Sequence, residues 1–108
     1  MTYSWQVVYL STKDQTNSDG VTLSDAVVEI KWRRIGVDSE GNSAKVVGYS
    51  TLSAESTAEA DFTAFADLTE EKVIGWLNTL NSASLDSYHE KIQKKLSGVT
   101  TQRAAPWA

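Results

Sequence analysis

The chain has 108 residues, no cysteine, one histidine and a net charge of −4. This length fits one domain with its own core, and the missing cysteines exclude disulfides, zinc–thiolate sites and cysteine nucleophiles. The acidic balance argues against a nucleic-acid partner, and no apolar run approaches the roughly 20 residues that a membrane helix needs. We therefore expect one domain without nucleic-acid or membrane contacts.

Residues 3–10 alternate between two faces, and their aromatic and β-branched content predicts a strand. One face of this strand is expected to carry Tyr3, Trp5, Val7 and Tyr9. The polar segment 11–20 ends in the turn-forming pair Asp19-Gly20, which predicts a loop.

Residues 26–35 show the clearest strand pattern. Its two faces are expected to carry Ala26, Val28, Ile30 and Trp32 on one side, and Glu29, Lys31 and Arg33 on the other. Since Trp32 faces away from both cations, packing of its ring in the core is favoured over stacking on a base. The turn-rich segment 36–43 and a returning strand over 45–53 complete an antiparallel meander of at least three strands.

Residues 54–67 have no clear period and predict an irregular connection, with either a short fourth strand or a single helical turn. Phe62 and Phe65 are expected to anchor this connection over the core.

The apolar period changes from two residues to three or four at Leu68. Thr69 is a suitable N-cap, because its hydroxyl can accept a bond from a first-turn N–H. Glu70 and Glu71 follow at the positive end of the helix dipole, and Leu68 and Val73 have the spacing of a hydrophobic staple. These signals predict a helix over about 70–80. Its apolar stripe would consist of Val73, Trp76, Leu77 and Leu80.

A second helix is expected to follow, with Ser84 as N-cap and Gly98 just beyond its end. Its apolar stripe would consist of Leu85, Tyr88, His89, Ile92 and Leu96. The predicted fold class is therefore α+β: an antiparallel sheet of three to four strands in the N-terminal half, with two C-terminal helices packed on one face. Residues 1–98 form the single domain, and residues 99–108 form an extended tail.

Known catalytic patterns are weak in this sequence. His89 is the only histidine and is better explained as a partly buried, hydrogen-bonded residue than as a general base. Segment 15–20 resembles a calcium loop, but Gln15 and Ala26 occupy two ligand positions. No glycine-rich phosphate loop is present. We therefore assign no catalytic, cofactor or metal residue.

Charge is distributed unevenly along the chain. Residues 46–71 contain six acidic and no basic residues, whereas residues 91–108 contain four basic and no acidic ones. The two segments could attract each other within a protomer or between neighbours. A solvated surface is the favoured interpretation.

The tail ends in Pro106-Trp107-Ala108, which places a large aromatic beside the last residue of the sequence. Tryptophan is a frequent interface anchor, and an exposed one is an apolar liability. Trp107 is expected either to fold back on its own core or to dock on a neighbour. The candidate partner-binding residues are Lys31, Arg33, Arg34, Arg103, Pro106 and Trp107.

Several of these segments occur together in a group of small proteins of tailed phages, notably phages of marine cyanobacteria, which this chain resembles. The matching residues are Trp5, Ser18-Asp19-Gly20-Val21, Trp32-Arg33, Gly48-Tyr49, the block Phe62–Trp76, Ile92-Gln93 and Pro106-Trp107.

The resemblance implies a structural or accessory protein of the virion, such as a capsid decoration or a head–tail or tail component. Its partners would be capsid, portal or tail subunits, with self-association as a further option. It would be found in the virion, and in the host cytoplasm before assembly. The alternative is a phage-encoded modulator that binds a host enzyme, and a small enzyme is the least favoured option.

Overall fold

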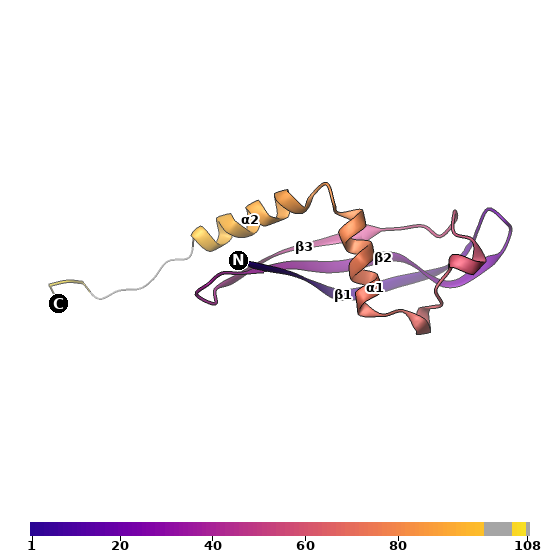
Figure 1. Cartoon of the computed structure of the whole chain (residues 1–108), viewed down its shortest axis with the longest axis horizontal. Coiled ribbons are helices and arrows are strands. Elements are labelled where there is room, and N and C mark those ends of the chain that lie inside the picture. Colours follow the sequence, from indigo (N-terminus) through magenta and orange to yellow (C-terminus); the bar gives the residue numbers. More distant parts are fainter. Residues whose placement is uncertain (99–104, 108) are drawn as a thin grey trace.

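The computed structural model describes residues 1–98 and 105–107. Three strands form one antiparallel sheet in the order β1–β2–β3: β1 (Thr2–Thr16), β2 (Thr22–Val37) and β3 (Ser43–Thr51). Two short 3₁₀ turns follow, η1 (Glu59–Asp61) and η2 (Phe65–Asp67), and then the helices α1 (Glu70–Leu80) and α2 (Leu85–Ser97). The predicted α+β class, with a sheet followed by two helices, is confirmed (Figure 1).

The hairpin of β1 and β2 is longer than the sequence predicts. Residues 11–16, expected in a loop, continue β1, and Thr12 and Gln15 pair with Val27 and Leu23. Pairing with an apolar partner strand overrides the weak strand preference of this polar segment. The turn itself is held by Asn17, whose Oδ1 accepts bonds from the backbone N–H groups of residues 19 and 21.

Bulges in the hairpin change which side chains face the helices. Val8 is an extra residue in β1, so Tyr9 pairs with Lys31 and points away from the face that carries Trp5. A second shift makes Val28 the extra residue in β2, and Val27 is buried in its place. Because side chains alternate along a strand, one extra residue reverses the faces beyond it. The predicted placements of Tyr9 and Val28 are therefore wrong.

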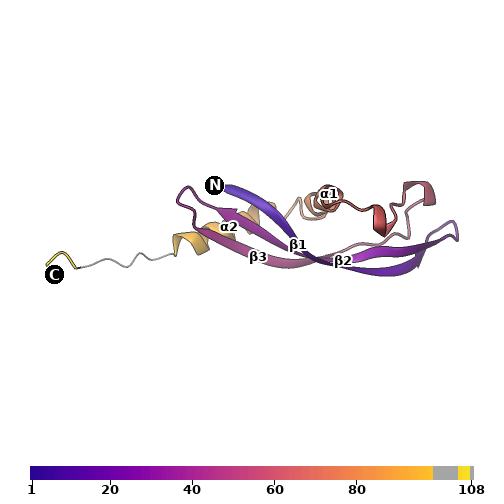
Figure 2. The same cartoon turned by 90° about the horizontal axis from the view of Figure 1, so that it is seen from below.

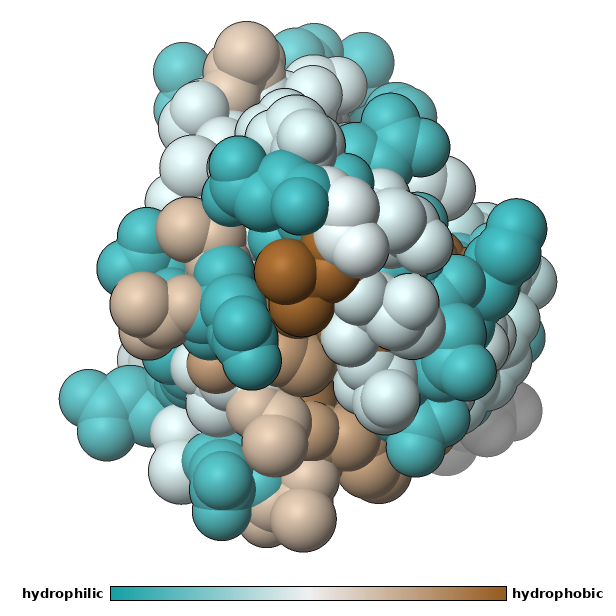
Figure 3. Space-filling model, turned by 90° about the vertical axis from the view of Figure 1, so that its right-hand side faces the viewer, coloured by the Kyte–Doolittle hydropathy of each residue, from teal (hydrophilic) through white to brown (hydrophobic). Residues whose placement is uncertain are grey.

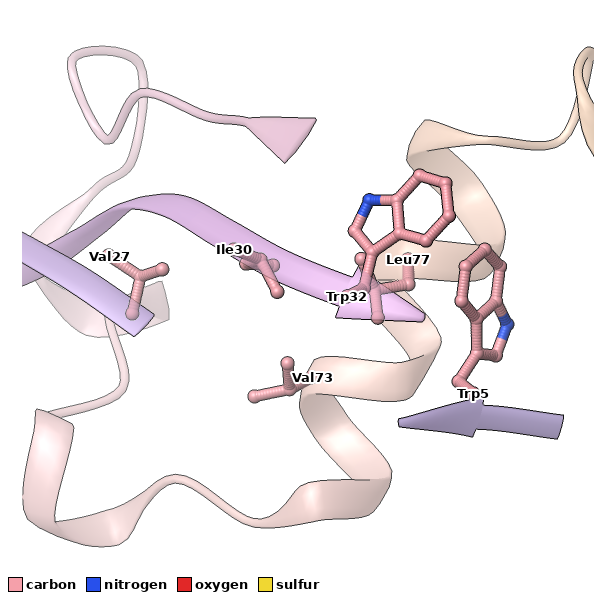
Figure 4. Close-up of a cluster of buried hydrophobic side chains, with 6 residues drawn as sticks. All are labelled: Trp5, Val27, Ile30, Trp32, Val73 and Leu77. Carbon is pink, nitrogen blue, oxygen red and sulfur yellow. The ribbon is translucent and has the colours of Figure 1, made fainter. Parts of the chain in front are cut away.

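Both helices lie on one face of the sheet, as predicted, and no helix of the described residues covers the opposite face (Figure 2). The main core lies between this inner face and α1 (Figure 4). It consists of Trp5, Val27, Ile30, Trp32, Val73 and Leu77. The rings of Trp5 and Trp32 are nearly perpendicular, in a T-shaped pair with a centroid distance of 5.1 Å, an arrangement that aromatic pairs favour. Burial of Trp32 confirms its predicted role.

Two glycines on the inner face allow this close packing. A Cβ at Gly48 would lie 2.5 Å from Cζ2 of Trp32, and one at Gly36 would lie 2.6 Å from Cγ2 of Ile92. Both positions thus need glycine because a ring or an α2 side chain occupies the space of a Cβ.

Residues 54–67 contain the two 3₁₀ turns and no fourth strand. Phe62 packs on a small second cluster of Leu23, Ala26 and Ala54, which confirms one expected anchor. Phe65 is 46% exposed, so its predicted role as an anchor is wrong. Apolar side chains are visible among hydrophilic ones at this end of the molecule (Figure 3).

Helix α1 has the predicted bounds, and the Thr69 hydroxyl accepts a bond from the N–H of Lys72 at 3.2 Å. The predicted stripe is confirmed for Val73 and Leu77, which are buried, whereas Leu80 is 46% exposed. Helix α2 ends at Ser97 as expected.

Candidate protein-binding surfaces

The uncovered side of the sheet carries a cluster of aromatic, apolar and charged side chains, here called the outer face. It consists of Gln6, Tyr9, Glu29, Lys31, Arg33, Val47 and Tyr49. Three of these residues combine large apolar groups with high exposure: Tyr9 at 42%, Val47 at 47% and Tyr49 at 59%.

Lys31 lies at the centre of the outer face, paired with Tyr9 on one side and Tyr49 on the other. Its Nζ is 5.9 Å from the centroid of the Tyr9 ring and 5.5 Å from that of Tyr49, within the range of cation–π attraction. The Tyr9 hydroxyl donates to Oε1 of Glu29 at 3.0 Å. Desolvation and this carboxylate raise the pKa of Tyr9, so its phenol remains a donor. These contacts hold the cation in place between two rings.

Arg33 lies beside this group on the same face, next to Val47. Its Nη1 donates to Oε1 of Gln6 at 3.2 Å, and its buried Nε has no hydrogen-bond partner among the described residues. Lys31 and Arg33 are thus both on the outer face, as the strand pattern predicts.

Arg34 lies on the inner face, where it is enclosed by the protein's own side chains. Its guanidinium carbon is 4.8 Å from the Trp5 ring centroid and 5.7 Å from that of Tyr3. Burial lowers the pKa of Arg34, although the group stays charged at neutral pH. Of the three strand cations proposed as partner-binding residues, Arg34 is therefore the one that lies on the inner face, under the helices.

His89 completes this inner group. Its Nε2 lies 3.3 Å from Nε and 3.2 Å from Nη2 of Arg34, and its ring stacks on Tyr3 at a centroid distance of 3.7 Å. Since a guanidinium only donates, Nε2 must be the acceptor and the imidazole is neutral. Desolvation first, and then the charge of Arg34, lower the pKa of His89, while Asp86 opposes the shift. The predicted hydrogen-bonded, partly buried histidine is confirmed.

A polar network at the junction of the two helices is a feature that the sequence interpretation misses. Asn81 is buried; its amide nitrogen donates to Oγ of Ser50 and its amide oxygen accepts from the hydroxyl of Tyr88. The same Ser50 hydroxyl accepts from Nε1 of Trp32 at 2.9 Å. The sequence does contain a signal for this network: an asparagine lies next to the apolar stripe of a helix. A buried asparagine needs hydrogen-bond partners, and tryptophans elsewhere in the chain supply N–H donors.

A cleft with a volume of about 320 Å³ opens between α1, the first part of β2 and the connection after β3. Its apolar lining includes Leu52, Ala54, Phe62, Leu68, Trp76 and Leu80. Polar residues also line it, among them Asp25, Asp61 and Lys72. We refer to it as the α1 cleft.

The tail residues are only partly described. Arg103 lies outside the described residues. Pro106 is exposed, and Trp107 is 88% exposed. Trp107 thus presents nearly its whole indole to the surroundings.

Within residues 1–98 and 105–107, no group of three or more histidine, cysteine, aspartate or glutamate side chains is placed to hold a metal ion. In that same part of the chain, no helix has the length and hydropathy to span a bilayer.

Comparison with known proteins gives one match. A search of the curated proteins and a search of the solved structures found no similar protein. The family model described as a domain of unknown function, DUF7936, matches residues 1–107. Because this match covers nearly the whole chain, the protein belongs to the DUF7936 family.

Proposed function

We propose that this protein is a structural accessory of a phage particle, either a capsid decoration or a head–tail or tail component, and that it acts by binding other particle proteins. The observation that carries the proposal is the outer face, where exposed tyrosines surround a cation that is held in place. Aromatic residues and arginine are the residues enriched in protein interfaces. The resemblance of residues 62–76 to proteins of tailed phages supports the setting.

The chemistry of the outer face suggests what the partner presents. Lys31 and Arg33 offer two cations, while Val47 and Tyr49 offer apolar area beside them. A complementary surface would place carboxylates over the cations and apolar side chains over the rings. Because these side chains project from a sheet, the backbone that carries them is already ordered before a partner binds.

The alternative is a modulator that binds a host enzyme, and it has an observation of its own. All six acidic side chains of segment 55–71 are exposed. They are Glu55, Glu59, Asp61, Asp67, Glu70 and Glu71. Such a surface suits a basic partner, in contrast to the outer face.

Quantitative mass spectrometry of gradient-purified particles tests the proposal. We expect the chain to be present at a fixed ratio to the major capsid protein. Lys31→Glu should lower this ratio at least about tenfold, because reversing a charge at the centre of an interface costs more than about 1.4 kcal/mol. Lys13→Glu makes the same charge change on an exposed residue of β1 outside the outer face and should leave the ratio unchanged.

Absence of the chain from purified particles would contradict the proposal. Its recovery with a host enzyme instead, in a complex lost when the acidic residues of segment 55–71 are neutralised, would establish the alternative. If Lys31→Glu and Lys13→Glu both occupy particles at the wild-type ratio, binding does not use the outer face.

A further inference from the structure

The α1 cleft has an apolar interior that the described residues leave open. Trp76 and Leu80 line it from α1, and Phe62 lines it from the connection between η1 and η2. Its volume of about 320 Å³ is at the lower end of the range for pockets that hold small molecules, about 300–1,000 Å³. It is therefore suited to one or two side chains of a peptide.

The polar residues of the cleft favour a ligand that has a hydrogen-bond donor and a positive charge. Asp25 and Asp61 line it, and Asp61 belongs to the exposed acidic segment 55–71. Lys72 also lines it, but its Nζ already donates to Oγ1 of Thr63. A buried indole N–H needs an acceptor, which either aspartate can supply.

The tail of this chain has the matching chemistry. Trp107 is 88% exposed, and Pro106 restricts the backbone beside it, which reduces the entropy lost on docking. Arg103 is the one basic residue of the sequence 99–108, which has no acidic residue, and Lys91, Lys94 and Lys95 lie on α2 just before it. Residues 46–71, by contrast, contain six acidic residues and no basic one.

The cleft and the tail of one protomer are poorly placed for each other. Helix α2 has 13 residues and carries the chain about 20 Å away from its start. Helix α1 and the connection after β3, which line the cleft, lie beyond that start (Figure 1). A tail returning to the cleft must retrace this length and pass α1, which is about 10 Å wide. The nine residues from 99 to 107 span at most about 30 Å when fully extended. Docking of Trp107 in the cleft of its own chain would therefore require these nine residues to be fully extended.

We infer that the α1 cleft binds the Pro106-Trp107 segment of a second copy of this chain, with the indole among the apolar residues and the basic residues of segment 91–103 toward the acidic segment. The contact is heterologous, because cleft and tail are different surfaces, so it can continue from copy to copy as a ring or filament. This inference rests on the proposed binding role and names one partner for it.

Sedimentation velocity of the full chain tests the inference. We expect the wild-type protein to associate as its concentration is raised to about 1 mM, and the association to weaken with added salt. Trp107→Ala and Leu80→Lys should each weaken it at least about thirtyfold, as loss of an interface hot spot does. Val47→Lys adds the same charge at a side chain of almost equal exposure, 47% against 46% for Leu80. Because Val47 belongs to the outer face, this variant should associate like the wild type.

Mixing the two defective variants gives the sharper result. Trp107→Ala retains its cleft and Leu80→Lys retains its tail, so an equimolar mixture should form a dimer that grows no further. Circular dichroism first establishes that each variant is folded. A wild-type protein that stays monomeric, association that survives Trp107→Ala, or folded variants that fail to form the mixed dimer would each overturn the inference.

The two proposals fail separately. Loss of particle binding in Lys31→Glu with self-association intact leaves the inference standing, and monomeric wild-type protein that still occupies particles leaves the proposed function standing.

Discussion

His89 shows how one side chain can be fixed by neighbours that are distant in sequence. The imidazole lies between the Tyr3 ring and the Arg34 guanidinium, residues of β1 and β2. Protonation would remove the acceptor at Nε2 and place a second positive charge beside Arg34. This position is therefore a pH-sensitive point of stability.

We expect this histidine to make the fold less stable in mild acid. Its folded-state pKa lies below the unfolded value of about 6.5, so the unfolded chain binds the proton more readily. The contribution of neutral His89 to the free energy of unfolding is therefore complete above about pH 6.5. It is lost as the pH falls through the folded-state pKa of His89. In His89→Gln an amide oxygen can replace Nε2 as acceptor at every pH. The melting temperature of the wild type should fall more than that of the variant between about pH 7.5 and about pH 5.5. Equal falls would show that His89 is not the group responsible.

At the scale of elements, the contact of the helices with the sheet depends on small residues and on a polar junction. Trp32 fills the space above Gly48, and its indole nitrogen donates to Ser50. Asn81 connects the same serine to Tyr88 of α2. The ring of Trp32 is thus held from several sides and has little freedom to move aside.

Two glycine substitutions should have opposite effects. Gly48→Ala places a Cβ 2.5 Å from the Trp32 ring, and overpacking of this kind destabilises by about 1–3 kcal/mol. Gly75→Ala lies within α1 with no atom within 4 Å of its new Cβ, and alanine is favoured over glycine in a helix by about 0.5–1 kcal/mol. Urea unfolding of both variants measures these changes. A Gly48→Ala protein as stable as the wild type would show that the Trp32 ring can shift.

At the scale of the whole molecule, the folded domain and the tail are separable in what they contribute. The main core is made by β1, β2 and α1, and α2 packs on β2 and β3. The side chain of Trp107 is 88% exposed, so it contributes little burial to a single chain. Its apolar area is available to a partner.

Removal of residues 103–108 should therefore leave the domain intact. We expect the free energy of unfolding of the monomer to change by no more than about 0.5 kcal/mol, as for surface changes, while self-association is lost. Urea unfolding at low protein concentration, compared with the full chain, measures the first effect. A larger loss of stability would show that the tail packs on its own core.

The features that the sequence predicts correctly are those that depend on neighbouring residues. The bounds of α1 follow from the Thr69 cap and the change of apolar period, and the burial of Trp32 follows from alternation over a few positions. Lys31 and Arg33 share the outer face for the same reason.

The tertiary structure decided the rest, because strand register and helix docking depend on contacts between distant segments. Bulges at Val8 and Val28 place Tyr9 beside Lys31 and bury Val27, and pairing extends β1 through a polar segment. Packing of α2 on the sheet places His89 within hydrogen-bond distance of Arg34. The α1 cleft likewise exists only where α1, β2 and the connection after β3 meet. Local pattern specified the elements, and the free energy of packing them together determined which side chains remained available for binding.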